Sequence, residues 1–234
     1  HIRRRQLEPT QVAVRTEWLG ADRTLVGALC VLSVAQLAGW GTIGLPAIVG
    51  RPMAADLQMD IAAAFAGTTV LYVMMGLISP LLAQPFLRFG TRRVMAAGTL
   101  CTAIGFVVLS LAQGPLSYFA AWVLLGIGGA ATLTTAAHIV LNEIAGRGAR
   151  SAIGALMLVT GLSSSIFWPI TAVLSDALGW RGTCLVYALL MAAICCPLYL
   201  FGLPGAVAAK DEATATARVA AQPREPVARS TFFR

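Results

Sequence analysis

Charged side chains are scarce in this sequence, and their scarcity excludes an ordinary soluble domain. Only 12% of the 234 residues are Asp, Glu, Lys or Arg, and 58% are hydrophobic. Soluble domains carry about 25% charged residues, because most of their surface must face water. A mean hydropathy of +0.78 therefore indicates that much of this chain faces an apolar medium.

The few charges are clustered, and long intervals between the clusters contain none. These intervals lie between Arg23 and Arg51, Asp60 and Arg88, Arg93 and Glu143, Arg150 and Asp176, and Arg181 and Lys210. A helix needs about 20 apolar residues to cross the hydrocarbon core, so each interval accommodates one crossing. The longest accommodates two, separated by the helix-stop signal Gln113-Gly114-Pro115. The sequence predicts an all-α, polytopic membrane protein with six transmembrane helices, at about 24–49, 62–86, 94–112, 116–141, 152–174 and 183–203.

The basic residues fall on one side of the predicted membrane. If the N-terminus is cytoplasmic, all 17 Lys and Arg residues except Arg51 and Arg181 lie in cytoplasmic segments. The positive-inside rule then predicts that both termini are cytoplasmic. The membrane is expected to be the inner cell membrane. The net charge of +7 thus indicates topology and not nucleic-acid binding, which would need a basic face with interleaved aromatic residues.

Composition divides the chain into three parts. Residues 1–23 are predicted to be a cytoplasmic N-terminal segment, and residues 24–203 the six-helix bundle. Residues 204–234 are rich in Ala, Thr, Pro and charge, which is typical of a flexible linker. Because apolar residues resume at Phe232 and Phe233, we expect the linker to lead to a second six-helix half.

The sequence offers no pattern for a metal or a disulfide. The five cysteines lie in predicted helices without CxxC spacing, so neither a zinc site nor a disulfide framework is indicated. No cofactor is expected. The predicted spans also lack Asp, Glu, Lys and Arg, so this segment offers no obvious ion-coupling carboxylate and no fixed counter-charge for an ionic substrate.

Glycines crowd the first and fourth predicted helices. They are Gly39, Gly41, Gly44, Gly126, Gly128 and Gly129. Small residues allow close helix packing in lipid, and glycine or proline also permits kinks, here near Pro46 and at Pro169.

Polar side chains inside the spans mark a candidate substrate cavity. They share faces of the first and fifth predicted helices, with a contribution from the fourth. The predicted cavity residues are Ser33, Gln36, Trp40, Thr132, Thr135, Thr160, Ser164 and Trp168. Such groups are costly in lipid and normally face the bundle interior or a water-filled cavity. The alternative for each Ser or Thr is a hydrogen bond to its own helix backbone.

His138 lies near the cytoplasmic end of the fourth predicted helix. Because histidine changes charge near neutral pH, it is a candidate proton relay. The alternative is an ordinary histidine at the membrane interface.

The segment Arg88-Phe89-Gly90-Thr91-Arg92-Arg93, between the second and third predicted helices, resembles the cytoplasmic loop signature of the major facilitator superfamily, G-x-x-x-D-R-x-G-R-R. Gly90 falls on the second glycine, Arg88 on the first basic position, and Arg92 with Arg93 on or beside the last. Leu87 replaces the aspartate that helps to latch this loop to the other half of such transporters.

Residues 20–204 are similar to bacterial members near the monocarboxylate and oxalate/formate carriers, through Ala55–Phe65, Phe167-Trp168-Pro169 and Leu178–Gly182. This resemblance implies twelve helices in two halves, each built from inverted three-helix repeats, with a small organic solute bound between the halves. It further implies transport by alternating access, symport as one mode, and a carboxylate as one candidate solute. An anion's counter-charge would then be expected in the second half.

Two other classes compete with a carrier. A six-helix scaffold or truncated half-carrier that does not transport is one alternative. An intramembrane serine protease is the other, suggested by Gly161–Ser164 with His138. That enzyme class needs G-x-S-G with its base on a later helix, whereas Ser164 replaces the final glycine and His138 comes earlier. We therefore expect no enzymatic activity.

The predicted topology can be tested with reporter fusions at each end of the chain. Both reporters are expected on the cytoplasmic side, because this placement puts nearly all basic residues there. Reporters found on opposite sides of the membrane would contradict an even number of crossings.

Overall fold

The computed structural model describes the backbone of residues 9–145 and 148–203 and the side chains from Thr24 onward. Every regular element in these ranges is helical. The elements are α1 Pro9–Ile43, α2 Leu45–Asp56, α3 Ile61–Ile78, the 3₁₀ turn η1 Ser79–Leu82, α4 Ala83–Phe89, α5 Thr91–Ser110, α6 Pro115–Thr132, α7 Thr134–Ala145, α8 Ala149–Gly161, α9 Ser163–Leu190, the π-helical turn η3 Met191–Cys195 and α10 Cys196–Gly202.

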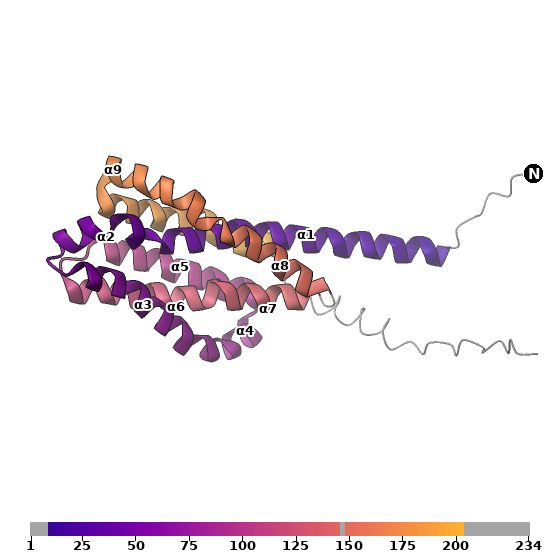
Figure 1. The fold of residues 1–234 in the computed structure, drawn as a ribbon. Coiled ribbons are helices and arrows are strands. Elements are labelled where there is room, and N and C mark those ends of the chain that lie inside the picture. The colour runs from indigo at the N-terminus through magenta and orange to yellow at the C-terminus, as the bar shows by residue number, and fades with distance from the viewer. Residues whose placement is uncertain (1–8, 146–147, 204–234) are drawn as a thin grey trace, which may run out of the picture.

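These elements join into long apolar segments that run alongside one another (Figure 1). Within the described ranges, five segments are long and apolar enough to cross a membrane. They are Thr24–Asp56, Ile61–Phe89, Thr91–Ser110, Pro115–Ala145 and Ala149–Gly202. The chain is therefore a multi-pass membrane protein, with five such segments where the sequence predicted six crossings.

The last segment folds back on itself. Its 54 residues would measure about 80 Å if straight, more than twice the hydrocarbon core. Gly179 adopts φ 70° and ψ 170°, a conformation that glycine takes readily. The hydroxyl oxygens of Thr171 and Tyr187 lie 2.5 Å apart although 16 residues separate them in the chain, which a straight helix would hold about 24 Å apart. Ala149–Gly202 is thus a helical hairpin that turns at Gly179.

The first helical segment is longer than predicted at both ends. α1 begins at Pro9, inside the predicted N-terminal segment, and α2 continues to Asp56. Arg51 consequently lies within α2 and not in a loop. Polar residues end the apolar stretch that can cross a membrane, but they need not end the helix. Ala, Glu, Leu and Arg all favour helix, so the helix can continue beyond that stretch. Arg3 to Arg5, Arg147 and the linker 204–234 lie outside the described residues.

Some helix breaks were predicted and others were not. The predicted separation near Gln113–Pro115 is confirmed, since α5 ends at Ser110 and α6 begins at Pro115. The kink before Pro46 is also confirmed, where α1 gives way to α2. α9 continues as helix through Pro169. The break between α6 and α7 was missed: Leu133 is extended, with φ −84° and ψ −150°.

Glycines allow α6 to pack closely between α3 and α5. A Cβ atom on Gly128 would lie 2.3 Å from Thr102 Oγ1 and 2.7 Å from the Gly98 carbonyl oxygen on α5. A Cβ on Gly126 would lie 2.6 Å from Met74 Cβ on α3. Such distances leave no room for a side chain, so the prediction that small residues bring these helices together is confirmed.

Arg181 joins three helices at the end of the bundle where α9 turns. Its Nη2 lies 2.9 Å from Asp56 Oδ2 at the end of α2. Nη1 donates to the Ser110 carbonyl at the end of α5, at 2.7 Å. The guanidinium also stacks on Trp180, 4.4 Å from the ring centroid. Sequence reasoning did not identify Asp56 as the partner of Arg181. This end and α4 lie toward opposite ends of the bundle (Figure 1).

Replacing Gly128 by Ala is expected to destabilise the bundle by about 1–3 kcal/mol, because the added methyl group must push α5 and α6 apart. Thermal unfolding of the purified protein in detergent should show a lower Tm. Gly76→Ala is the matched control, since nothing lies within 4 Å of its added Cβ. An unchanged Tm for Gly128→Ala would contradict the close contact.

Candidate functional site

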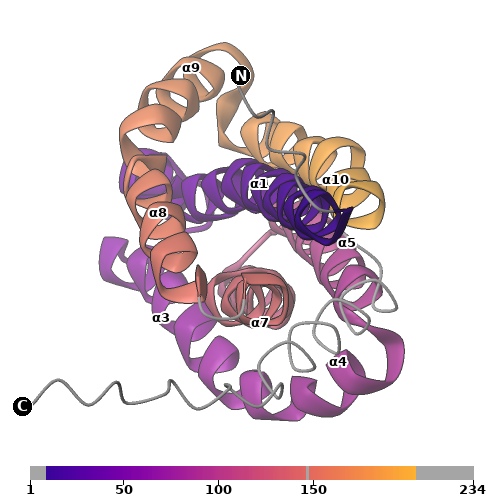
Figure 2. The same ribbon diagram turned by 90° about the vertical axis from the view of Figure 1, so that its right-hand side faces the viewer.

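A groove of about 470 Å³ runs along the membrane-spanning part of the bundle. Side chains from α1, α3, α7, α8 and α9 line it. Figure 2 shows α3 and α8 on the same side of the bundle, with α1 and α7 further in. The consecutive elements α7, α8 and α9 therefore form one concave surface together with α1 and α3 from the first third of the chain.

The groove contains much of the predicted cavity. Gln36, Trp40, Thr160, Ser164 and Trp168 all line it. His138 lines it as well, so this residue faces the same space as the predicted cavity residues. Their role in binding a solute stays a prediction.

The other predicted cavity residues lie elsewhere. Ser33 is partly buried on α1 and does not line the groove. Thr132 donates to its own helix, to the Gly128 carbonyl at 2.9 Å. Thr135 is exposed outside the groove, and Thr134 lines the groove instead. The break at Leu133 changes the direction in which the side chains of α7 point relative to those of α6. The prediction assumed one regular helix across this position, and it therefore assigned Thr135 to the cavity in place of Thr134.

Gln36 has a structural partner that follows from the same break. In a continuous helix the Thr132 carbonyl would accept a hydrogen bond from the amide of residue 136. Here Gln36 Nε2 donates to that carbonyl, at 2.7 Å, and Tyr199 Oη lies 3.5 Å from it. Gln36 is only 1% exposed. Its amide therefore satisfies a carbonyl at the C-terminal end of α6 while the side chain also borders the groove.

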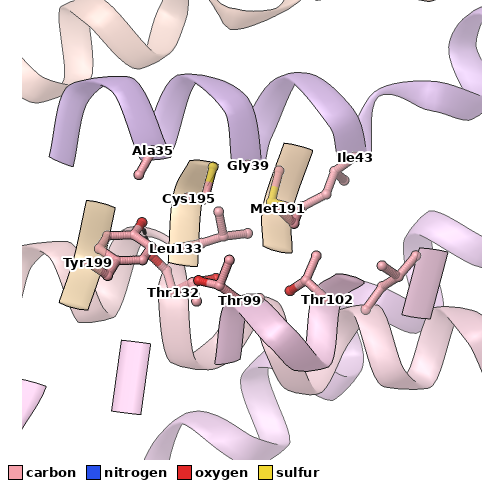
Figure 3. A pocket seen from close by; sticks show the side chains of 12 residues that line it. Ala35, Gly39, Ile43, Thr99, Thr102, Thr132, Leu133, Met191, Cys195 and Tyr199 are labelled. Carbon is pink, nitrogen blue, oxygen red and sulfur yellow. Dashed lines mark hydrogen bonds between the residues drawn. The ribbon is translucent and has the colours of Figure 1, made fainter. Parts of the chain in front are cut away.

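A second, much smaller cavity lies inside the bundle between α1, α5, α6 and the elements η3 and α10 (Figure 3). Its volume is about 10 Å³, close to the space of a single water molecule. Three threonine hydroxyls beside it donate to backbone carbonyls of their own helices, as Thr99 does to Met95 and Thr102 to Gly98. This cavity is therefore a packing gap and not a solute site.

Sequence reasoning missed several lining residues. Thr68 and Tyr72 line the groove from α3, and they stand one turn apart on one face of an uncharged span, a signal that was present in the sequence. Tyr72 stacks on Trp40, with ring centroids 6.3 Å apart and planes 29° apart. Ser163 also lines the groove.

The described lining residues include no Asp, Glu, Lys or Arg. No group of three or more His, Cys, Asp or Glu side chains that could hold a metal occurs in the described part of the chain. Ser163, Ser164 and His138 share the groove, but the described residues contain no hydrogen bond between a serine and this histidine, as an activated nucleophile would need.

The basic motif forms a one-residue turn. Only Gly90, with φ 79°, separates α4 from α5, so Arg88, Arg92 and Arg93 lie on helices and not in a loop. Arg92 Nη2 donates to the Leu200 carbonyl near the end of α10, where a cation is favoured by the helix dipole. Thr91 Oγ1 donates to Glu143 Oε2 on α7, at 3.5 Å. The turn is thereby tied to two other helices.

The long apolar helices, joined in one bundle with the basic turn at Gly90, define a polytopic membrane protein. The chain belongs to the major facilitator superfamily, whose family model matches residues 28–234. Members of this superfamily are transporters. No curated protein gives a significant match to the chain.

Replacing Gln36 by Leu is expected to cost about 1–3 kcal/mol of stability, because it leaves the buried Thr132 carbonyl without its main partner. The Tm of the purified protein in detergent should fall. Ser33→Ala on the same helix serves as the control and should change stability by no more than about 0.5 kcal/mol. Equal Tm values for the two variants would show that the amide does not stabilise the break.

Proposed function

We propose that this protein is a secondary carrier, and not an enzyme, that moves a small organic solute through the groove by alternating access. The observation that carries the proposal is a polar-lined groove of about 470 Å³ inside helices that are otherwise apolar. Its volume falls within the range of about 300–1,000 Å³ that is typical of small-molecule sites. Polar side chains at this depth are costly unless they face water or a ligand.

The proposed topology has six crossings, with both ends of the chain on the cytoplasmic side of the inner membrane. The hairpin at Gly179 supports it, because each leg of Ala149–Gly202 is then a separate crossing. The hydrogen bond between Thr171 and Tyr187 supports antiparallel legs that lie side by side.

We further propose that a second six-helix half covers the open side of the groove. Tyr72 is 50% and Trp168 46% exposed there, beside polar groups that lipid would not satisfy. The solute would then bind between two halves that rock about it. A non-transporting scaffold is the second candidate. It is favoured because the described residues cover only one side of the groove and do not enclose a solute.

We propose a carboxylate as the first solute to test, on the expectation from the sequence that Phe167-Trp168-Pro169 resembles a segment of monocarboxylate carriers. The full-length protein in proteoliposomes should take up at least one labelled solute from a panel of short monocarboxylates, dicarboxylates, sugars and amino acids. Uptake should fall several-fold in Trp40→Ala, which removes a groove wall, and should persist in the off-groove control Ser33→Ala. Absence of uptake for the whole panel would contradict the carrier and favour the scaffold.

If His138 relays protons that are coupled to the solute, the initial uptake rate should depend on pH. Charged side chains on α7 and on its neighbours α5 and α8 are Glu143, Arg92, Arg93 and Arg150; none of them lines the groove. The described side chains of α1 and α6 carry no charge near neutral pH. His138→Gln, which keeps hydrogen bonding without the charge, should flatten the pH profile of initial uptake rates. An unchanged profile would exclude His138 as the titrating group.

A further inference from the structure

We infer that the solute of this groove carries a flat, unsaturated ring that packs against the stacked Trp40–Tyr72 pair. The inference rests on the proposed carrier function, since it names the class of solute for the same groove. It concerns the shape of the apolar part of the solute and is independent of the solute's charge.

The stacked Trp40–Tyr72 pair forms a preformed aromatic surface that borders the groove. The ring centroids of Trp40 on α1 and Tyr72 on α3 lie 6.3 Å apart, and the ring planes are inclined by 29°, within the range of stacked aromatic pairs. Both side chains line the groove, and Tyr72 is half exposed. The two rings hold each other in place, so a solute ring can stack on this surface without ordering a loose side chain.

Trp168 adds a second aromatic side chain from another part of the chain. It lines the groove from α9 and remains nearly half exposed. Its indole nitrogen would lie 3.2 Å from a Cβ atom on Gly44, so the side chain is packed against the α1–α2 break. Aromatic rings from three helices thus border one space, and its lining carries no Asp, Glu, Lys or Arg among the residues that the structure describes.

The depth of these rings argues against an ordinary aromatic belt. Tryptophan and tyrosine concentrate at the two membrane interfaces, near the ends of a span. Trp40 instead lies at the midpoint of the span Thr24–Asp56, and Tyr72 lies near the middle of Ile61–Phe89. At that depth the partly exposed indole of Trp40 and the exposed phenol of Tyr72 need a partner other than headgroups.

Polar side chains that border the groove beside the rings can bind one polar group of the solute. Thr68 and Thr134 border the groove together with His138. Thr160 is less available, since its hydroxyl donates to the Leu156 carbonyl at 2.5 Å. A flat ring with a single polar substituent therefore matches the lining, with its ring on the aromatic surface and its polar group toward these side chains.

Equilibrium binding of labelled benzoate to the purified full chain in lipid nanodiscs tests the inference. Cyclohexanecarboxylate, with the same charge and carbon count but a puckered ring, is the matched competitor. Benzoate should bind about 3- to 10-fold more tightly, as expected for one aromatic contact. Trp40→Leu and Tyr72→Leu should each reduce this ratio toward one, whereas Trp40→Phe should keep it. Phe201→Leu, on an 82% exposed residue outside the groove, should leave it unchanged.

The outcomes separate this inference from the carrier proposal. Equal binding of the two ring acids, or a preference that survives in both leucine variants, would overturn the inference. So would uptake of an aliphatic solute by a protein that binds neither ring acid, which would leave the carrier function standing. A benzoate preference without any uptake in proteoliposomes would support the inference and contradict the carrier. Benzamide binding without benzoate binding would support the flat ring and exclude the carboxylate.

Discussion

Hydrocarbon cannot form hydrogen bonds, and this constraint decides where each polar group of the bundle lies. The backbone satisfies it by being helical over most of the described spans. Thr42, Thr99, Thr102 and Thr171 satisfy it by donating to carbonyls of their own helices. Where α6 is broken at Leu133, the freed Thr132 carbonyl is satisfied by Gln36 from α1. Other polar side chains, among them Thr68, Thr134 and Ser164, line the groove.

The same constraint explains the arrangement of the helices. Apolar surface gains little by leaving lipid for protein, so close packing must hold the helices together. Gly126 and Gly128 allow α6 to contact α3 and α5 almost backbone to backbone. α1 and α9 then meet on another side of the bundle, where the stacked rings and Trp168 border the groove. The helices are thus packed tightly around α6 and leave the groove open on the side of α1 and α9.

Sequence reasoning predicted the features that depend on composition. Charge-free intervals predicted the helical spans, Gln113–Pro115 predicted a break, and the loop motif indicated the family that the family model confirms. Features that depend on a local backbone choice were missed. The extended Leu133 has no proline or glycine beside it, so nothing in the sequence predicted that Thr134 would replace Thr135 in the groove. The contact of Arg181 with Asp56 joins residues 125 positions apart, which no local pattern encodes.

The central claim is that a water-accessible groove lies among these membrane-spanning helices. Cysteine accessibility in intact membranes tests it most directly, with single cysteines placed in a protein whose native cysteines are replaced. Thr134→Cys and Ser164→Cys, which lie in the groove, should react with a charged, water-soluble thiol reagent. Leu158→Cys, at a position 78% exposed but outside the groove, should not react, because lipid covers it. Groove cysteines that stay unreactive, or equal reaction at all three positions, would contradict the account.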